Sequence, residues 1–225
     1  MTTNTFAAIF DMDGLLFDTD PHLWRESMWE VSQKYGVKID PSLFKYTQGL
    51  RIYEVTSFWK EKIGWEPSIS AHEMGDEIIE NITQRTICKG QLLPGVLSTL
   101  DTLHAANIRM GVATSSPMKM LAPLIEHFGI GHYFEHLSSA DTCESGKPHP
   151  EVYLNCAAAM GVQPWNCVAF EDSVNGMVAA KAARMKVIVV PEQEKIANPK
   201  FGLADLILPS LSNFNLQEFE AVCNL

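Results

Sequence analysis

Short apolar runs alternate with longer amphipathic segments through the second part of the chain, from residue 92 onwards. Short apolar runs bounded by turn residues are typical of buried strands, and longer periodic segments are typical of helices. The pattern predicts strands at residues 108–113, 136–139, 167–170, 187–190 and 206–208. It predicts helices at residues 96–106, 117–128, 148–160, 174–183 and from about 216. This alternation indicates a parallel sheet with helices on both faces.

The first part of the chain has a different pattern. Residues 5–10 are almost wholly apolar and predict one more buried strand, which belongs with the sheet. Residues 19–90 contain no convincing strand. We therefore predict an α/β fold, in which a Rossmann-like parallel sheet flanked by helices carries an inserted helical domain. The predicted core comprises residues 1–18 and 93–225, and the insertion comprises residues 19–92.

The predicted insertion contains three helical segments, at residues 20–35, 51–62 and 70–90. Asp20 fits the N-cap position of the first, and Ser70 fits that of the third. Most of the tryptophans lie in this region, and we expect them to form the core of the small helical domain. They are Trp24, Trp29, Trp59 and Trp65. The alternative is that one of them faces a substrate pocket.

Composition narrows the class of protein. The chain has 225 residues and a formal net charge of −10, which argues against nucleic acid or an anionic membrane as partner. A small anionic substrate is still compatible, because a bound metal and one lysine can reverse the local field. No apolar run approaches the ~18 residues of a membrane span, and the N-terminus does not resemble a secretory signal. The five scattered cysteines, without a C-x-x-C pair, indicate free thiols in a reducing cytoplasm.

Two carboxylates follow the first predicted strand. Asp11 and Asp13 are spaced i and i+2, which directs both side chains to the same side of an extended backbone, and Gly14 lets the chain turn away. Like charges this close resist ionisation, and a divalent cation would resolve the conflict. The alternative is an acidic turn at the surface.

Other predicted strands also end in reactive residues, where ligands of such sheets bind. Thr114-Ser115-Ser116 precedes a helix and could cradle phosphate, although Ser116 could simply be an N-cap. Glu171 and Asp172 could complete a Mg²⁺ site with the first carboxylates, or could cap the next helix. Lys147 lies in a loop between glycine and proline that could aim its ammonium inward, the alternative being a solvated lysine. Together these residues indicate phosphoryl transfer through an aspartyl phosphate.

These residues resemble the four motifs of the haloacid dehalogenase superfamily of phosphatases. The motifs are Asp11-Met12-Asp13-Gly14, Thr114-Ser115-Ser116, Lys147-Pro148-His149-Pro150 and Glu171-Asp172-Ser173. The resemblance covers essentially the whole chain, and the helical insertion resembles the cap of this family. Within it, the sequence is most similar to bacterial sugar-phosphate phosphatases of the 2-deoxyglucose-6-phosphate or hexitol-phosphate type. Segments that carry this closer match are Gly49-Leu50-Arg51, Leu92-Leu93-Pro94-Gly95-Val96, Ser145-Gly146-Lys147-Pro148-His149-Pro150 and Glu171-Asp172-Ser173-Val174-Asn175-Gly176-Met177.

The resemblance implies the chemical roles. Asp11 would attack phosphorus, and Asp13 would protonate the leaving sugar oxygen and then deprotonate the hydrolytic water. Mg²⁺ would be held by the Asp11 carboxylate, the main-chain carbonyl of Asp13, and Asp172. Glu171 would support the metal, with direct ligation left open.

The resemblance also implies the substrate contacts. Gly14, Thr114, the Ser115 amide and Lys147 would hold the phosphoryl group. The cap would close to exclude water and contact the sugar. Arg51 is its candidate for the sugar or for distal substrate groups; the alternative is a surface arginine at a helix start.

The main rival interpretation is a sugar-phosphate mutase similar to β-phosphoglucomutase. Those enzymes carry a histidine in the first cap helix, where this chain has Leu23, with His22 one residue earlier. One step along a helix turns the side chain by about 100°, so hydrolysis is favoured, although Thr19 is shared with the mutases. A true dehalogenase would lack Asp13, and a binding module would have a broken motif. We expect a cytoplasmic monomer acting on a small sugar phosphate whose identity the sequence leaves open.

Overall fold

The computed structural model describes residues 6–19, 21–47 and 50–224. The chain divides into two compact units, which are described separately. Unit 1 comprises Met1–Asp18 and Gln91–Leu225, and unit 2 comprises Thr19–Gly90. The predicted N-cap at Asp20 and the start of the first strand at Thr5 lie outside the described residues, as does Gly49.

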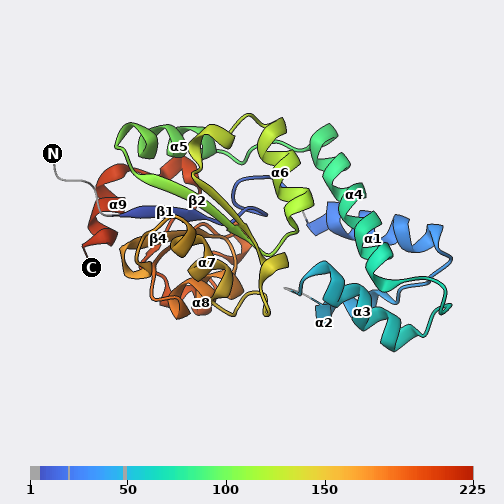
Figure 1. The fold of residues 1–225 in the computed structure, drawn as a ribbon. Helices are drawn as coiled ribbons and strands as arrows, with labels where there is room; N and C mark the ends of the chain where they lie inside the picture. Colours follow the sequence, from blue (N-terminus) through green and yellow to red (C-terminus); the bar gives the residue numbers. More distant parts are fainter. Residues whose placement is uncertain (1–5, 20, 48–49, 225) are drawn as a thin grey trace. The chain divides into compact units, whose positions relative to one another are not determined.

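Unit 1 contains a six-stranded parallel sheet, which confirms the predicted fold class (Figure 1). Its strand order is β3-β2-β1-β4-β5-β6. The strands are β1 (Ala7–Phe10), β2 (Arg109–Thr114), β3 (His136–Ser139), β4 (Cys167–Glu171), β5 (Lys186–Val189) and β6 (Leu206–Ile207). Strand β1 lies between β2 and β4 and is buried along its whole length, which explains its unbroken apolar sequence.

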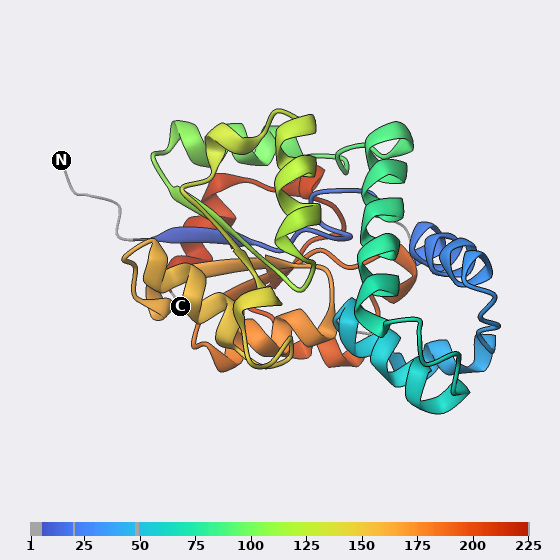
Figure 2. The same cartoon turned by 45° about the vertical axis from the view of Figure 1, so that its right-hand side comes forward.

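Helices cover both faces of this sheet, as Figures 1 and 2 show. They are α5 (Val96–Ala105), α6 (Met118–His127), α7 (Glu151–Ala159), α8 (Val174–Ala182) and α9 (Leu216–Cys223). Alternate strand residues face opposite sides. Ile9 belongs to the apolar core that includes residues of α7 and α8, whereas Phe10 stacks on Phe170, which in turn stacks on Phe219 of α9.

The prediction that a helix begins at residue 148 is wrong by three residues, because α7 begins at Glu151. Pro150 occupies the N-cap position. A residue that precedes proline is disfavoured in helical geometry, which excludes His149 from the helix. Residues 148–150 therefore belong to the loop that carries Lys147.

The described residues of unit 2 form helices joined by loops, with no strand; the α-helices are α1 (Pro21–Lys34), α2 (Phe44–Thr47), α3 (Ile52–Ile63) and α4 (Ala71–Lys89). Ser70 caps α4, since its hydroxyl accepts from the backbone N–H groups of His72 and Glu73 at 3.2 and 3.4 Å. Helix α3 ends at Gly64 in the left-handed conformation, with φ of 69°.

The tryptophan prediction for unit 2 is partly wrong. Trp59 and Trp65 are buried, and Trp24 is half-buried. Trp29 is 47% exposed. A tryptophan in an amphipathic helix is assigned to the core by its size, but its position on the helix decides which side it faces.

The two segments that connect unit 1 to the insertion run side by side. The Asp18 N–H donates to the Gln91 carbonyl at 3.0 Å, and the Leu93 N–H donates to the Leu16 carbonyl at 3.0 Å. The chain thus leaves unit 1 and returns to it at neighbouring points. None of the helices in the described ranges has the length and apolar character needed to cross a membrane.

Candidate active site

The carboxyl ends of β1, β2 and β4 bring the predicted site residues of unit 1 together. Asp11 follows β1, Thr114 ends β2 and Glu171 ends β4. Phe10 pairs with both Val112 and Phe170, so the three ends lie at one edge of the sheet. This edge is where ligands bind in open parallel sheets.

Lys147 lies at the centre of this group, with 7% of its surface exposed. Its ammonium donates to Asp11 Oδ1 at 2.8 Å, to Glu171 Oε1 at 2.7 Å and to the Ala113 carbonyl at 2.9 Å. The alternative of a solvated lysine is therefore wrong. Burial by itself lowers the pKa of Lys147. The negative charges of Asp11 and Glu171 outweigh this effect and raise the pKa above its ordinary value. Opposite charges in a buried site favour each other's ionised form.

The loop that carries Lys147 is anchored to helix α7. The backbone N–H groups of Glu144 and Ser145 donate to the two carboxylate oxygens of Glu151, at 3.1 and 3.2 Å. Glu151 is the first residue of α7, where a carboxylate also interacts favourably with the helix dipole. These two bonds fix the loop just before Lys147. The anchored loop directs the Lys147 side chain to the edge of the sheet.

Three acidic residues form the strongest candidate for a cation site among the described residues. Ligand atoms of Asp11, Glu171 and Asp172 lie within 4.8 Å of one another. Burial, and next the charge of Glu171, raise the pKa of Asp11 from 3.8 to about 7. The same two causes raise the pKa of Asp172 well above its usual value. Buried hard oxygen donors that resist ionisation fit a divalent cation such as Mg²⁺.

Glu171 differs from the other two acids, because the protein saturates its carboxylate. Oε1 accepts from Lys147 at 2.7 Å and from the Tyr153 hydroxyl at 2.6 Å. Oε2 accepts from the N–H of Asp172 at 3.2 Å, and from the N–H and the hydroxyl of Ser173 at 3.3 and 3.1 Å. A carboxylate offers about four lone-pair positions. These bonds favour Asp11 and Asp172 as direct ligands, with Glu171 supporting them.

Gly14 allows Asp172 to approach the turn after β1. A Cβ at position 14 would lie 2.6 Å from Asp172 Oδ2, and the residue has a φ of 72°. Only glycine adopts this conformation readily without a steric penalty. The glycine is therefore explained by the packing of two acidic motifs against each other.

Ser116 has a different role from the N-cap that the sequence suggested. Helix α6 has Pro117 at its N-cap, and the Ser116 hydroxyl instead donates to Asp13 Oδ2 at 2.5 Å. The Ser116 carbonyl accepts from the Ser139 hydroxyl at 2.7 Å. Its hydroxyl thus positions the second carboxylate of the first motif, and only the placement of a serine at the β2 end could have signalled this from the sequence.

The two residues before Ser116 lie at the end of β2 and in the turn that follows. Thr114 is buried, and its hydroxyl accepts from the Ser116 N–H at 3.0 Å. A hydroxyl that accepts one bond can still donate its proton to a ligand oxygen. Ser115 is half-buried. These positions are compatible with the predicted phosphate contacts.

Arg51 belongs to unit 2, directly before α3. Its guanidinium donates to Glu54 Oε1 through Nε at 3.1 Å and through Nη2 at 2.7 Å. Although burial raises the pKa of Glu54, hydrogen bonds from Arg51 hold it below its ordinary value. This pairing fixes the guanidinium at the start of α3.

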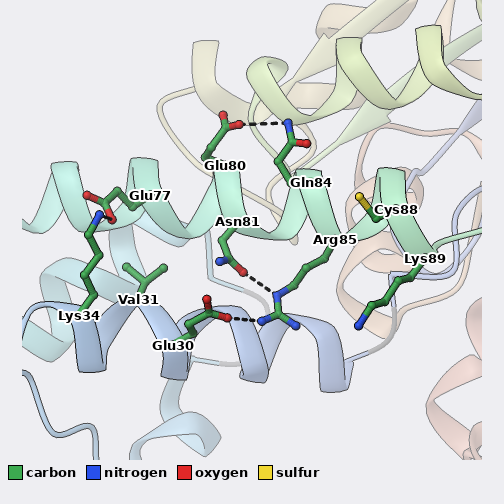
Figure 3. Close-up of a pocket in the computed structure, with 10 residues that line it drawn as sticks. All are labelled: Glu30, Val31, Lys34, Glu77, Glu80, Asn81, Gln84, Arg85, Cys88 and Lys89. Carbon is green, nitrogen blue, oxygen red and sulfur yellow. Dashed lines mark hydrogen bonds and ion pairs between the residues drawn. The ribbon is translucent and has the colours of Figure 1, made fainter.

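A groove of about 860 Å³ runs along α1 and α4 in unit 2 (Figure 3). It is lined by charged side chains that pair with one another: Lys34 with Glu77, and Arg85 with Glu30. The site residues predicted from the sequence all lie in the described part of the chain, and none of them lines this groove. These ion pairs connect α1 and α4, and exposed pairs of this kind contribute little to stability.

Comparison with known proteins shows which enzymes the chain is similar to. A family model described as haloacid dehalogenase-like hydrolase matches residues 8–190. Hexitol phosphatase B of Escherichia coli strain K12 is 41% identical over 218 residues, which cover 94% of this chain and 95% of that protein. Fructose-1-phosphate phosphatase YqaB of the same strain is 32% identical over 81% of this chain and 94% of its own length.

A solved structure of similar fold belongs to β-phosphoglucomutase from Clostridium difficile. It superposes with a TM-score of 0.79 and 25% identity, over 97% of this chain and 96% of that chain. Phosphatases and a mutase thus share this arrangement of elements. The arrangement of elements alone therefore does not distinguish between the two kinds of reaction.

Proposed function

Because this chain belongs to the haloacid dehalogenase-like hydrolase family, we propose that it hydrolyses sugar phosphates with Mg²⁺ through an aspartyl phosphate on Asp11. The two relatives reported above match most of this chain and are named phosphatases. The chain is therefore a phosphoric monoester hydrolase, as the motifs indicated. The observation that carries the proposal is the cluster at the sheet edge of buried Asp11, Lys147 and Glu171 with half-buried Asp172. One ammonium among three carboxylates is suited to a cation and a phosphoryl group.

Asp11 is the proposed nucleophile. As its carboxylate oxygen bonds to phosphorus, the bond from phosphorus to the sugar oxygen breaks. Water then attacks phosphorus, which releases inorganic phosphate and restores the carboxylate. Lys147 holds Asp11 Oδ1 at 2.8 Å and favours its ionised form, which is the form that attacks.

Asp13 is the proposed general acid and base. It would give its proton to the sugar oxygen as that group leaves, and would take a proton from the water in the second step. The neutral Ser116 hydroxyl donates to its carboxylate at 2.5 Å, whereas the Lys147 ammonium donates to Asp11. The bond from Ser116 orients the Asp13 carboxyl group for proton transfer.

Mg²⁺ would be held by the carboxylates of Asp11 and Asp172 and by the main-chain carbonyl of Asp13. When bound, it supplies positive charge that stabilises the phosphoryl oxygens and favours the ionised form of Asp11. Gly14, Thr114, the Ser115 amide and Lys147 would bind the phosphoryl oxygens. Thr114 and Lys147 are buried beside the strand ends, and preorganised donors of this kind stabilise a transferring phosphoryl group.

We propose that hexitol, hexose or deoxyhexose phosphates are the substrates, which the phosphatase names of the relatives support. Unit 2 would act as a cap that excludes water and contacts the sugar. Arg51 is the proposed contact for the sugar or for distal groups. Its Glu54 partner lets it present a fixed guanidinium rather than a flexible one.

The test is phosphate release from a panel of hexitol, hexose and deoxyhexose phosphates with Mg²⁺. We expect Asp11→Asn to abolish release while circular dichroism stays unchanged. We expect Arg51→Gln to raise KM for sugar phosphates but not for p-nitrophenyl phosphate. Turnover by the folded Asp11→Asn protein, or full activity after complete metal removal, would refute the proposed mechanism.

A mutase is the second candidate, favoured by the likeness to β-phosphoglucomutase. The sequence argues for hydrolysis, since Leu23 stands where such mutases carry a histidine. Incubation with a hexose phosphate separates the two. Phosphate release without a glucose bisphosphate primer supports hydrolysis, whereas strict primer dependence without free phosphate supports the mutase.

We propose further that the protein works in the cytoplasm as a monomer, without nucleic acid or membrane partners. The cysteines are all free thiols in the structure, which supports a reducing compartment. The charge of −10 supports the absence of polyanionic partners. Size-exclusion chromatography with light scattering tests the oligomeric state.

A further inference from the structure

Tyr153 is a buried tyrosine whose hydroxyl the proposed mechanism does not use. It lies on α7 with none of its surface exposed. Its hydroxyl donates to Glu171 Oε1 at 2.6 Å, and its oxygen lies 3.3 Å from Lys147 Nζ. The lysine nitrogen is also 4.8 Å from the centre of the tyrosine ring. A phenylalanine would fill the same space, so the hydroxyl needs an explanation of its own.

We propose that Tyr153 is a positioning residue, whose hydroxyl shares Glu171 Oε1 with Lys147 and thereby keeps the ammonium directed at Asp11. The inference rests on the proposed function, because the position of Lys147 matters through Asp11 and the phosphoryl group. Tyr153 itself touches neither of the proposed reacting atoms.

The geometry of Lys147 provides the first step of the argument. An ammonium has three protons, and here four acceptors surround it: Asp11 Oδ1, the Ala113 carbonyl, Glu171 Oε1 and the Tyr153 oxygen. The bond to the tyrosine is the longest of these, at 3.3 Å. Asp11 and Glu171 are the two charged acceptors, so both attract the ammonium electrostatically.

The Tyr153 hydroxyl weakens the attraction of Glu171 for the Lys147 ammonium. Because its hydroxyl gives Glu171 Oε1 a second donor, that oxygen is stabilised by two groups instead of by the lysine alone. Loss of the hydroxyl would leave Lys147 as the donor that must satisfy Oε1. The ammonium would then move toward Glu171 and away from Asp11.

Glu171 cannot relieve this change by turning. Its Oε2 is fixed by the backbone and side chain of Ser173 and by the N–H of Asp172. On its other side, Gly176 of α8 lies so close that an added Cβ would come within 1.7 Å of Oε1. Because Glu171 is held in place, loss of the Tyr153 hydroxyl would shift the Lys147 ammonium instead.

The test is Tyr153→Phe, which keeps the ring and removes the hydroxyl. We expect kcat/KM for the best sugar phosphate to fall by about tenfold or more. We expect the inhibition constant of orthovanadate, which mimics the transferring phosphoryl group, to rise by a similar factor. Inhibition by inorganic phosphate should change less, because a correctly placed ammonium stabilises the transition state more strongly than the ground state.

The matched control is Tyr133→Phe, which removes another tyrosine hydroxyl from a carboxylate in unit 1. The Tyr133 hydroxyl donates to Asp101 Oδ1, and the pair is exposed. This variant should keep the wild-type kcat/KM and both inhibition constants. It controls for the general loss of one tyrosine–carboxylate bond.

The deciding quantity is the ratio of the inhibition constants of orthovanadate and inorganic phosphate. The test based on this ratio stays valid even if Tyr153→Phe is less stable. The ratio does not depend on how much of the protein is folded. An unchanged ratio, whether activity is kept or lost, overturns the inference. A wild-type protein that releases no phosphate from any ester refutes the proposed function and this inference with it, whereas normal turnover with an unchanged ratio refutes only the inference.

Discussion

Asp11 and Asp13 are two residues apart, yet their carboxylates have different partners. Asp11 accepts from the Lys147 ammonium and Asp13 accepts from the Ser116 hydroxyl. The Lys147 cation favours the ionised form of Asp11, which suits a nucleophile. The Ser116 hydroxyl orients Asp13, which suits a group that transfers protons.

The bond between Ser116 and Asp13 leads to a prediction at this scale. Ser116→Ala should lower kcat for sugar phosphates by about tenfold, because Asp13 loses the donor that orients it. Turnover of p-nitrophenyl phosphate should fall less, since its leaving group needs no proton. Steady-state kinetics with both substrates measures the difference.

Ser98→Ala is the control for this prediction. The Ser98 hydroxyl donates to the Gly95 carbonyl at an exposed position of unit 1. It should leave both substrates unaffected. Equal losses with both substrates in Ser116→Ala would show that the serine acts on the fold and not on proton transfer.

At the scale of elements, the junction of β4 with α8 holds the acidic motif. Glu171 ends the strand, and Ser173 caps the helix by accepting from the Gly176 N–H at 3.0 Å. The carboxylate of Glu171 lies against Gly176 in the first turn. The strand end and the helix start are thus packed around one side chain.

This packing predicts the effect of Gly176→Ala. In an ordinary helix, replacing glycine by alanine stabilises by about 1 kcal/mol. Here the new methyl group would overlap Glu171, so we expect a lower melting temperature and a loss of kcat/KM of about tenfold or more. Thermal denaturation and steady-state kinetics measure the two effects.

Gly202→Ala is the matched control, because nothing lies within 4 Å of a Cβ added at that position. It should preserve stability and activity. A Gly176→Ala protein as stable and as active as the wild type would mean that Glu171 has freedom to move, which contradicts its proposed rigidity.

At the scale of the whole molecule, the buried charges make stability depend on metal and on pH. Without metal, the pKa of Asp11 is about 7 in the folded chain against 3.8 as its ordinary value. The folded chain therefore binds more protons than the unfolded chain between these values. The stabilisation is complete below about pH 4 and is lost as the pH rises through about 7.

We accordingly expect the melting temperature of chelator-treated protein to fall between about pH 4 and pH 7 relative to that of Asp11→Asn, which lacks this titrating group. Mg²⁺ added at pH 8 should raise the melting temperature of the wild type, since it binds only the folded site. Differential scanning calorimetry measures both. A constant difference between the two proteins across this pH range would contradict the assignment of the titration to Asp11.

Much of the fold follows from local patterns, because each pattern reports how one element is buried. The continuous apolar run before Asp11 predicted a buried strand, and β1 is buried throughout. Local patterns failed where the partner of a residue lies elsewhere. Trp29 was assigned to the core by size and is 47% exposed. Ser116 was placed in a phosphate cradle, with a helix cap as the alternative, and its hydroxyl bonds to Asp13.

The sequence by itself determined the parallel α/β class and the residue types available for chemistry. It also predicted the position of the helical insertion. Only the tertiary structure decided which of these residues meet. Lys147 is 136 residues from Asp11 in the chain. The Lys147 ammonium contacts Asp11 because β1, which Asp11 follows, lies between β2 and β4. Tyr153 gave no signal in the sequence, since a buried aromatic residue on a helix is ordinary core. Its hydroxyl acquires a role only where folding places it beside Glu171, because a hydrogen bond depends on distance in space and not on separation along the chain.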